Sequence, residues 1–189
     1  MKSPDPFDGI MDGAVPKVLN YQEIDRFLTA IDSSHDLLAC RFMLMAGLRV
    51  AEAINVRVQD VCEERRAVFI SQGKGGKERW APMDVHTVNL AKIYAREKDL
   101  SPGDRFFHLC KRTMQRHIDD IRERAGIGWN VTAHTLRHTC ATWQLDKGIS
   151  LEMVRDNLGH TDINITQVYL HLNIRQRSRA YHEVTRFGI

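Results

Sequence analysis

Thr132-Ala-His-Thr-Leu-Arg-His-Thr-Cys-Ala-Thr-Trp143 is the stretch from which the rest of this chain is interpreted, because it predicts a helix with two distinct faces. One face carries the basic side chains, His134, Arg137 and His138. The opposite face carries Leu136, Cys140 and Trp143, which are expected to be buried. An imidazole beside a guanidinium suits an anionic oxygen, although an ordinary solvated helix face would produce the same pattern.

A zinc site on this helix is not expected. His134 and His138 have the four-residue spacing of a metalloprotease helix, but Thr135 occupies the position where that motif needs glutamate. No cysteine or carboxylate cluster in the sequence completes a ligand set. We therefore expect neither a metal ion nor an organic cofactor.

Helical spacing of apolar residues continues on both sides of this segment. Helices are expected at about 21–31, 36–46, 85–98, 113–125, 133–147, 150–158, 163–171 and 174–184, with a short one starting near Arg49. Glycines follow several of them as expected stops, namely Gly47, Gly126, Gly148 and Gly159. Strands at 67–72 and 79–83, joined by the glycine-rich loop 73–77, predict a hairpin. The expected fold class is mainly α with a small antiparallel β-sheet, that is, α+β.

Composition narrows the class of protein. The 189 residues are 43% hydrophobic and 27% charged, as in a globular domain, and the net charge is only +3. Basic residues cluster at 74–79, 111–124 and 175–186, so a basic face is expected despite this modest total. Four separated cysteines and the lack of an apolar run of about 20 residues indicate a cytoplasmic protein with free thiols and no membrane partner.

A second basic segment is Gly73-Lys-Gly-Gly-Lys-Glu-Arg79. It lacks the glycine–lysine spacing of a P-loop and precedes a strand instead of a helix, so nucleotide binding is not expected. Lys74 is therefore either part of a flexible basic hairpin tip or a proton donor that reaches a strand of DNA.

Three more residues could contribute to a site for an anion. Arg49 lies at a helix start, where backbone N–H groups favour anions, and Glu52 could orient a basic neighbour. His160 follows an expected helix end, and Tyr169 lies nine residues further on. A lone tyrosine on a short helix is ordinarily a core residue, which is also the expectation for Tyr21, Tyr94 and Tyr181.

Considered jointly, four motifs resemble the catalytic domain of the tyrosine recombinases, the phage-integrase and Xer-type family, over roughly residues 17–175. They are Gly47-Leu-Arg-Val-Ala-Glu52, Gly73-Lys-Gly-Gly-Lys-Glu-Arg79, His134-Thr-Leu-Arg-His-Thr-Cys-Ala-Thr142, and Leu158-Gly-His160 followed by Thr166-Gln-Val-Tyr169. The resemblance implies that family's catalytic-domain fold, with a linker or N-terminal arm at 1–18, a catalytic domain at 19–173 and a C-terminal helix or tail at 174–189.

The resemblance also implies a catalytic set, Arg49, Lys74, His134, Arg137, His160 and Tyr169. The arginines would clamp a phosphate and stabilise the charge of its five-coordinate transition state. Lys74, with Lys77 as its rival, would protonate the leaving 5′-oxygen. The histidines would assist proton transfer and hydrogen bonding while Tyr169 attacks the phosphorus.

The implied activity is site-specific recombination of double-stranded DNA through a covalent 3′-phosphotyrosine, without a metal or nucleotide. The family implies four protomers on two duplexes and a segment at 174–189 that docks on a neighbour, the alternative being a simple intramolecular helix. Because the net charge is only +3 and the chain corresponds to the catalytic half of such a protein, a mostly monomeric chain is expected without DNA. Family members usually carry a preceding DNA-binding domain, so this chain is expected to be either an excised catalytic domain or a minimal recombinase.

Recombination has three alternatives. A type IB topoisomerase uses the same types of catalytic residue, arginine, lysine, histidine and tyrosine, but rejoins the original strand. A non-catalytic DNA-binding regulator would form no covalent adduct with DNA. A metal-dependent hydrolase is the weakest alternative, because the sequence shows no ligand cluster.

Overall fold

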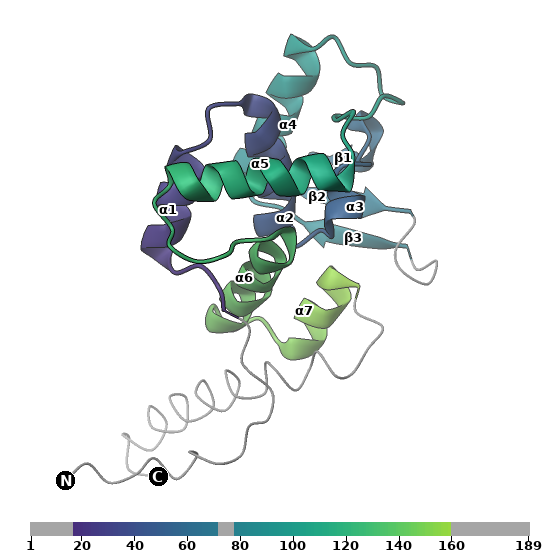
Figure 1. Ribbon diagram of the computed structural model, residues 1–189. Helices are drawn as coiled ribbons and strands as arrows, with labels where there is room; N and C mark the ends of the chain where they lie inside the picture. The colour runs from purple at the N-terminus through teal and green to yellow at the C-terminus, as the bar shows by residue number, and fades with distance from the viewer. Residues whose placement is uncertain (1–16, 72–77, 160–189) are drawn as a thin grey trace, which may run out of the picture.

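The structure is a computed structural model that describes residues 17–71 and 78–159. Its helices are α1 (Tyr21–Thr29), α2 (Ser34–Leu44), α3 (Val50–Ala53), α4 (Val85–Glu97), α5 (Lys111–Arg124), α6 (Ala133–Asp146) and α7 (Leu151–Leu158), with one 3₁₀ turn at Val58–Asp60. Its strands are β1 (Val61–Cys62), β2 (Ala67–Ile70) and β3 (Arg79–Pro82). The predicted class, mainly α with a small antiparallel sheet, is confirmed (Figure 1). The helices expected at 163–171 and 174–184 lie outside the described residues.

The sheet has one strand more than the sequence predicted. β2 pairs antiparallel with β3, as expected, and β1 pairs antiparallel with the other edge of β2. β1 is only two residues long, which is too short to show the period-two alternation that identifies a strand. Phe69 and Trp80 are paired on the outer face of the sheet, where their rings lie 5.1 Å apart and Trp80 is exposed. Val68 and Ala81, paired on the opposite face, are fully buried, so that face is directed inward.

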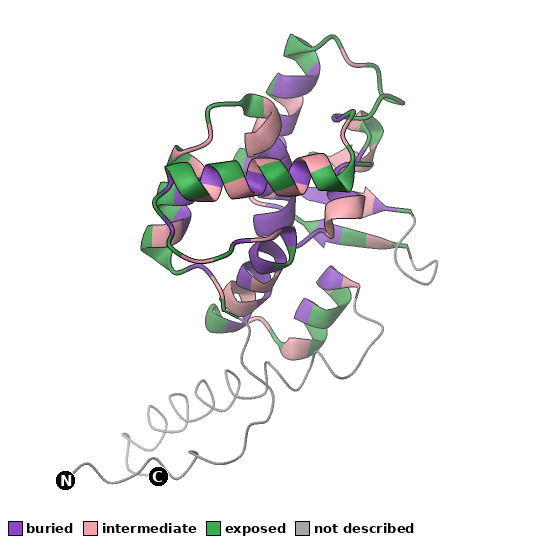
Figure 2. Cartoon of the chain, viewed as in Figure 1, coloured by how far each residue is buried: buried purple, intermediate pink, exposed green. Residues whose placement is uncertain are grey.

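The core is organised around α2, which passes through the centre of the molecule (Figures 1 and 2). This helix packs against α6, α4, α3 and α5, and it is buried on most of its surface at Leu38, Ala39, Cys40, Phe42, Met43 and Leu44. A helix that is apolar nearly all round belongs inside a domain. α6 and α7 pack beneath it and bring their residues to the edge of the sheet, where α7 also contacts β3.

Local signals explain most of the helix boundaries. α2, α4 and α7 each begin after a side-chain N-cap, at Ser33, Asp84 and Ser150 respectively. The glycines expected to stop helices adopt the left-handed conformation after α5, α6 and α7, with φ between 64° and 86°. That conformation reverses the chain and is open to glycine without strain, so these stops are confirmed.

Two expectations about aromatic burial are wrong. Tyr21 is 61% exposed, and its ring lies 4.3 Å from that of Trp143, which is only partly buried. The Tyr21 ring therefore lies at the surface over Trp143, and Trp143 packs against the edge of the core without being fully buried. Tyr94, by contrast, is buried as expected.

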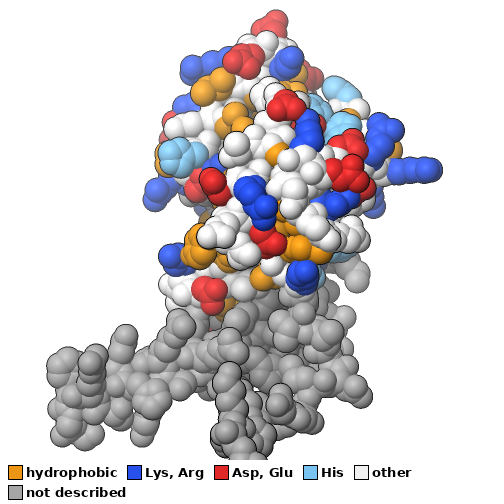
Figure 3. All heavy atoms as spheres, turned by 60° about the vertical axis from the view of Figure 1, so that its left-hand side comes forward, with side chains coloured by type: hydrophobic (Ala, Val, Ile, Leu, Met, Phe, Trp, Pro, Cys, Tyr) orange, Lys and Arg blue, Asp and Glu red, His pale blue; other side chains and the backbone are white. Residues whose placement is uncertain are grey.

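The expected basic face is partly neutralised where the structure describes it. In α5, Arg122 pairs with Asp119 and Glu123, and Arg124 pairs with Asp32. Figure 3 shows Lys and Arg interspersed with Asp and Glu on the side of the molecule it brings forward. Of the helices in the described part of the chain, none is long and apolar enough to cross a membrane.

Candidate active site

Arg137 in α6 lies inside the molecule, so the interpretation of its face as an ordinary solvated surface is wrong. Its residue is only 5% exposed. Nη1 donates to the carbonyl oxygen of Gly47 at 2.6 Å, and Nη2 donates to that of Leu158 at 2.7 Å. Burial and the nearby charge of Arg49 lower the pKa of Arg137 to about 10, partly opposed by Glu52. The guanidinium therefore remains charged at neutral pH.

Arg49 immediately precedes α3, as the sequence predicted, and it is bound to the glutamate of the same motif. The Arg49 backbone N–H and its Nη1 both donate to the carboxylate of Glu52, each at 2.8 Å. Its Nη2 donates to the carbonyl oxygen of Gly159 at 2.9 Å. Glu52 thus orients Arg49, and it also occupies one of the backbone N–H groups that were expected to favour an external anion.

Arg79 joins this cluster, although the sequence motif gave it no role. It is the first residue of β3, and its side chain is 9% exposed. Nη1 and Nη2 donate to the two oxygens of the Glu52 carboxylate at 3.1 and 2.7 Å, and Nε donates to the carbonyl oxygen of Asn157 at 2.9 Å. The signal that could have found it is Glu52 itself, because a buried carboxylate requires cationic partners.

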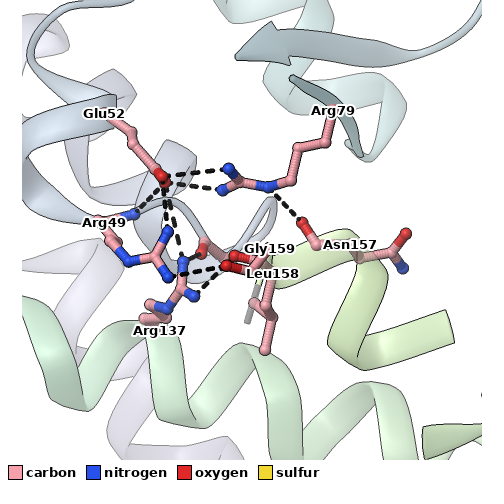
Figure 4. A network of polar contacts seen from close by, with 8 residues as sticks. Arg49, Glu52, Arg79, Arg137, Asn157, Leu158 and Gly159 are labelled. Carbon is pink, nitrogen blue, oxygen red and sulfur yellow. Dashed lines mark hydrogen bonds and ion pairs between the residues drawn. The ribbon is translucent and has the colours of Figure 1, made fainter. Parts of the chain in front are cut away.

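The three arginines converge on the C-terminal end of α7 (Figure 4). The last carbonyls of a helix lack partners within the helix and carry its negative dipole end. Here successive carbonyls each accept from a different arginine, with Arg79 on Asn157, Arg137 on Leu158 and Arg49 on Gly159. Residues from β3, α6 and the position just before α3 therefore fix the C-terminal end of α7.

Two glycines permit this close arrangement. Gly47 and Gly159 both have positive φ, at 67° and 64°, and each presents its carbonyl oxygen to an arginine. A Cβ atom on Gly47 would lie 2.3 Å from Cδ2 of Leu158, and one on Gly159 would lie 2.9 Å from the Arg79 side chain. A side chain at either position would therefore require Leu158 or Arg79 to move from its present contacts.

The cluster keeps a net positive charge. Three guanidinium groups surround one carboxylate, with Arg137 Nη1 3.8 Å from Glu52 Oε2. Burial by itself raises the pKa of Glu52, but hydrogen bonds from Arg79 and Arg49 outweigh burial and hold that pKa below its usual value. The carboxylate is therefore ionised at neutral pH, and the excess positive charge suits an anion such as a phosphodiester.

The histidines of α6 lie on either side of Arg137 in the sequence. His134 is exposed in the first turn of the helix, and His138 is partly buried. Burial, His134 and Arg137 together lower the pKa of His138, so this ring is neutral at pH 7. Exposure leaves His134 accessible to a ligand that approaches the N-terminal turn of α6.

The structure thus places Arg49 and Arg137 together and His134 on the same helix as Arg137. The other predicted site residues, Lys74, His160 and Tyr169, lie outside the described residues, as does Lys77. Within residues 17–71 and 78–159, no group of three or more His, Cys, Asp or Glu side chains is arranged to hold a metal ion.

A helical domain with a small sheet and a cluster of arginines can be compared with protein families of known activity. The family model described as "Phage integrase family" matches residues 17–176. The chain therefore belongs to the phage integrase family, and the resemblance found in the sequence is confirmed.

Individual relatives agree with this assignment. The chain is 30% identical over 197 residues to a tyrosine recombinase of Pseudothermotoga lettingae, covering 100% of this chain and 69% of that protein. It is 29% identical over 175 residues to tyrosine recombinase XerA of Pyrococcus horikoshii, covering 88% of this chain and 61% of that protein.

Solved structures show the same fold. A crystal structure of XerA recombinase superposes with a TM-score of 0.75 at 27% identity, covering 90% of this chain and 66% of that one. XerH site-specific recombinase, bound to palindromic difH substrate in a post-cleavage complex, gives a TM-score of 0.73 at 26% identity, covering 88% and 53%. The chain spans about 61–69% of the length of the two curated relatives.

Proposed function

We propose that this chain is the catalytic domain of a site-specific tyrosine recombinase that breaks and rejoins double-stranded DNA. The observation that carries the proposal is the arginine pair, with Arg137 buried and Arg49 partly buried. Arg49, just before α3, and Arg137, in α6, meet around one carboxylate with excess positive charge. Family membership supplies the reaction to which such a pair is suited.

The arginines have donors available for a phosphate. A guanidinium has five N–H groups, and the contacts described above use two of them on Arg137 and two on Arg49. Remaining N–H groups can bind non-bridging oxygens and stabilise the charge that develops at phosphorus. Loss of one such donor costs about 10²–10³ in rate in comparable oxyanion sites.

The remaining roles follow the family pattern. Tyr169 attacks phosphorus, the bond to the 5′-oxygen breaks, and Lys74 protonates that oxygen as it leaves. His134 and His160 assist the proton transfer from Tyr169 and bind the phosphate. A 5′-hydroxyl of another strand then displaces the tyrosine and restores the phosphodiester, so no net hydrolysis occurs.

DNA is the proposed partner, and four protomers on two duplexes the proposed assembly. The DNA-bound XerH structure supports the first of these, because it shares this fold at 26% identity. Residues 19–173 form the proposed catalytic domain, with 1–18 as a linker and 174–189 as a tail that docks on a neighbouring protomer. The relatives are named as recombinases, which favours strand exchange over the topoisomerase and regulator alternatives.

Trapping a covalent adduct tests the proposal. The chain is incubated with a library of nicked suicide duplexes of randomised sequence, in which cleavage releases a short strand and prevents rejoining. Denaturing gels and peptide mass spectrometry should find DNA on Tyr169. Tyr169→Phe should abolish the adduct, whereas Tyr21→Phe, which removes the hydroxyl of an exposed tyrosine, should not. An undiminished adduct with Tyr169→Phe would refute the assignment of the nucleophile.

A further inference from the structure

Arg79 connects three parts of the candidate site. Its guanidinium comes from β3, binds the carboxylate of Glu52 in α3 with two hydrogen bonds, and binds Asn157 at the end of α7 with a third. We propose that Arg79 is a positioning residue for strand cleavage, which holds Glu52 and the end of α7 so that Arg49 and Arg137 can bind the phosphate. This inference rests on the function proposed above.

Arg79 binds the Glu52 carboxylate, an anion that would otherwise compete with the phosphate. A carboxylate next to two phosphate-binding arginines competes with the phosphate for their N–H groups. In the structure both oxygens of Glu52 are bound by the forked guanidinium of Arg79, whereas Arg137 stays 3.8 Å from the nearer one. Without Arg79, the buried carboxylate would have only Arg49 and Arg137 as cationic partners within this cluster.

Arg79 also fixes the end of α7. Its Nε donates to Asn157, and its side chain packs so closely on Gly159 that a Cβ atom there would lie 2.9 Å from Cδ and Nη1. His160 is the next residue in the sequence. The contact therefore determines where the chain leaves α7 toward one of the proposed site residues.

The geometry requires arginine at this position. The two Nη atoms point to one carboxylate while Nε points to a carbonyl, which uses three donors of one planar group in different directions. A lysine ammonium is a single charged point that lacks this fork. Arg79→Lys should therefore keep the charge but lose part of the positioning.

The test measures cleavage in a single turnover, using the duplex that the wild-type chain selects from the randomised nicked library. Arg79→Gln is compared with Arg41→Gln, because Arg41 is a matched structural control. Arg41 is also largely buried, with a 16% exposed side chain, and its Nη2 and Nε bind Asp84 and Thr87 between α2 and α4. Both changes remove one charge and one ion pair, which is buried for Arg79 and partly buried for Arg41.

At saturating DNA, Arg79→Gln should slow adduct formation by about 10–100-fold, the size of effect seen when a group that orients metal-binding side chains is removed. Arg79→Lys should fall between that variant and wild type. Arg41→Gln should lower the thermal midpoint yet keep the cleavage rate within about threefold of wild type at a temperature where all variants are folded. In a double-mutant cycle, Glu52→Gln and Arg79→Gln should be non-additive, because they act through one contact.

Two results would overturn the inference while leaving the proposed function intact. One is wild-type cleavage by Arg79→Gln. The other is equal slowing by Arg41→Gln, which would make the Arg79 effect a general consequence of lost stability. A wild-type chain that forms no adduct with any duplex would instead refute the proposed function, and this inference with it.

Discussion

Replacing Glu52 with glutamine should destabilise the fold more than any exposed charge substitution. Glu52 has a 6% exposed side chain and accepts four hydrogen bonds, two from Arg49 and two from Arg79. A glutamine side chain has one acceptor oxygen, and its NH₂ group would face N–H donors. The change also leaves Arg49, Arg79 and Arg137 close together without a counter-charge.

The expected cost at pH 7 is about 3–5 kcal/mol, the usual effect of removing one partner from a buried ion pair. For a domain of this size, each kcal/mol lowers the thermal midpoint by about 2–4 °C, so the midpoint should fall by roughly 10 °C. Glu63→Gln is the control. Glu63 pairs with Lys92 at the surface and is largely exposed, so its loss should cost less than about 1 kcal/mol.

The cost of Glu52→Gln should also depend on pH. The folded-state pKa of Glu52 lies below its usual value of 4.5, because hydrogen bonds from Arg79 and Arg49 outweigh burial. The carboxylate therefore stabilises the fold above about pH 4.5, and this stabilisation is lost as the pH falls through the folded-state pKa. The difference in stability between wild type and Glu52→Gln should shrink over that acidic range.

Urea unfolding of wild type, Glu52→Gln and Glu63→Gln at pH 7 and pH 3 measures both quantities. The reasoning is refuted if Glu52→Gln costs no more than Glu63→Gln at pH 7. It is also refuted if the gap between wild type and Glu52→Gln stays constant with pH, since ionised Glu52 would then not be its source.

Three further predictions concern the chemistry and the packing of the site. Lys74→Ala should strongly slow cleavage of normal DNA. A substrate with sulfur at the 5′-bridging position should largely restore cleavage, because a thiolate leaves without protonation. If the sulfur substrate rescued Lys77→Ala and not Lys74→Ala, Lys77 would be the general acid. Adduct formation should persist in excess chelator, and loss of activity restored by magnesium or zinc would contradict a purely arginine- and lysine-based mechanism. Gly148→Ala should lower the unfolding free energy by about 1 kcal/mol, because Gly148 has positive φ but no atom near its Cβ position. Gly47→Ala should lower it by clearly more, because Gly47 also has positive φ and its Cβ would lie 2.3 Å from Leu158. Equal costs would show that the close packing is unimportant.

The sequence alone determined the elements of this fold because their signals are local. Apolar spacing predicted the longer described helices, and glycines predicted the ends of α5, α6 and α7, but the 3₁₀ turn at Val58–Asp60 was not predicted. The motifs also singled out Arg49 and Arg137 before any contact was known, and suggested that Glu52 would orient a basic neighbour. Strand β1 was not predicted, because two residues are too few to show the alternation of apolar and polar residues that identifies a strand.

Only the tertiary structure decided how the site is held together. The bonds from Arg79 to Glu52 and from Arg49 to Gly159 join residues 27 and 110 positions apart, far beyond the range of helical or strand periodicity. Three of the acceptors are backbone carbonyls at the end of α7, and every residue type has such a carbonyl. Side-chain identity therefore cannot reveal them, and only the packing of α7 against α6 and β3 brings them to the arginines.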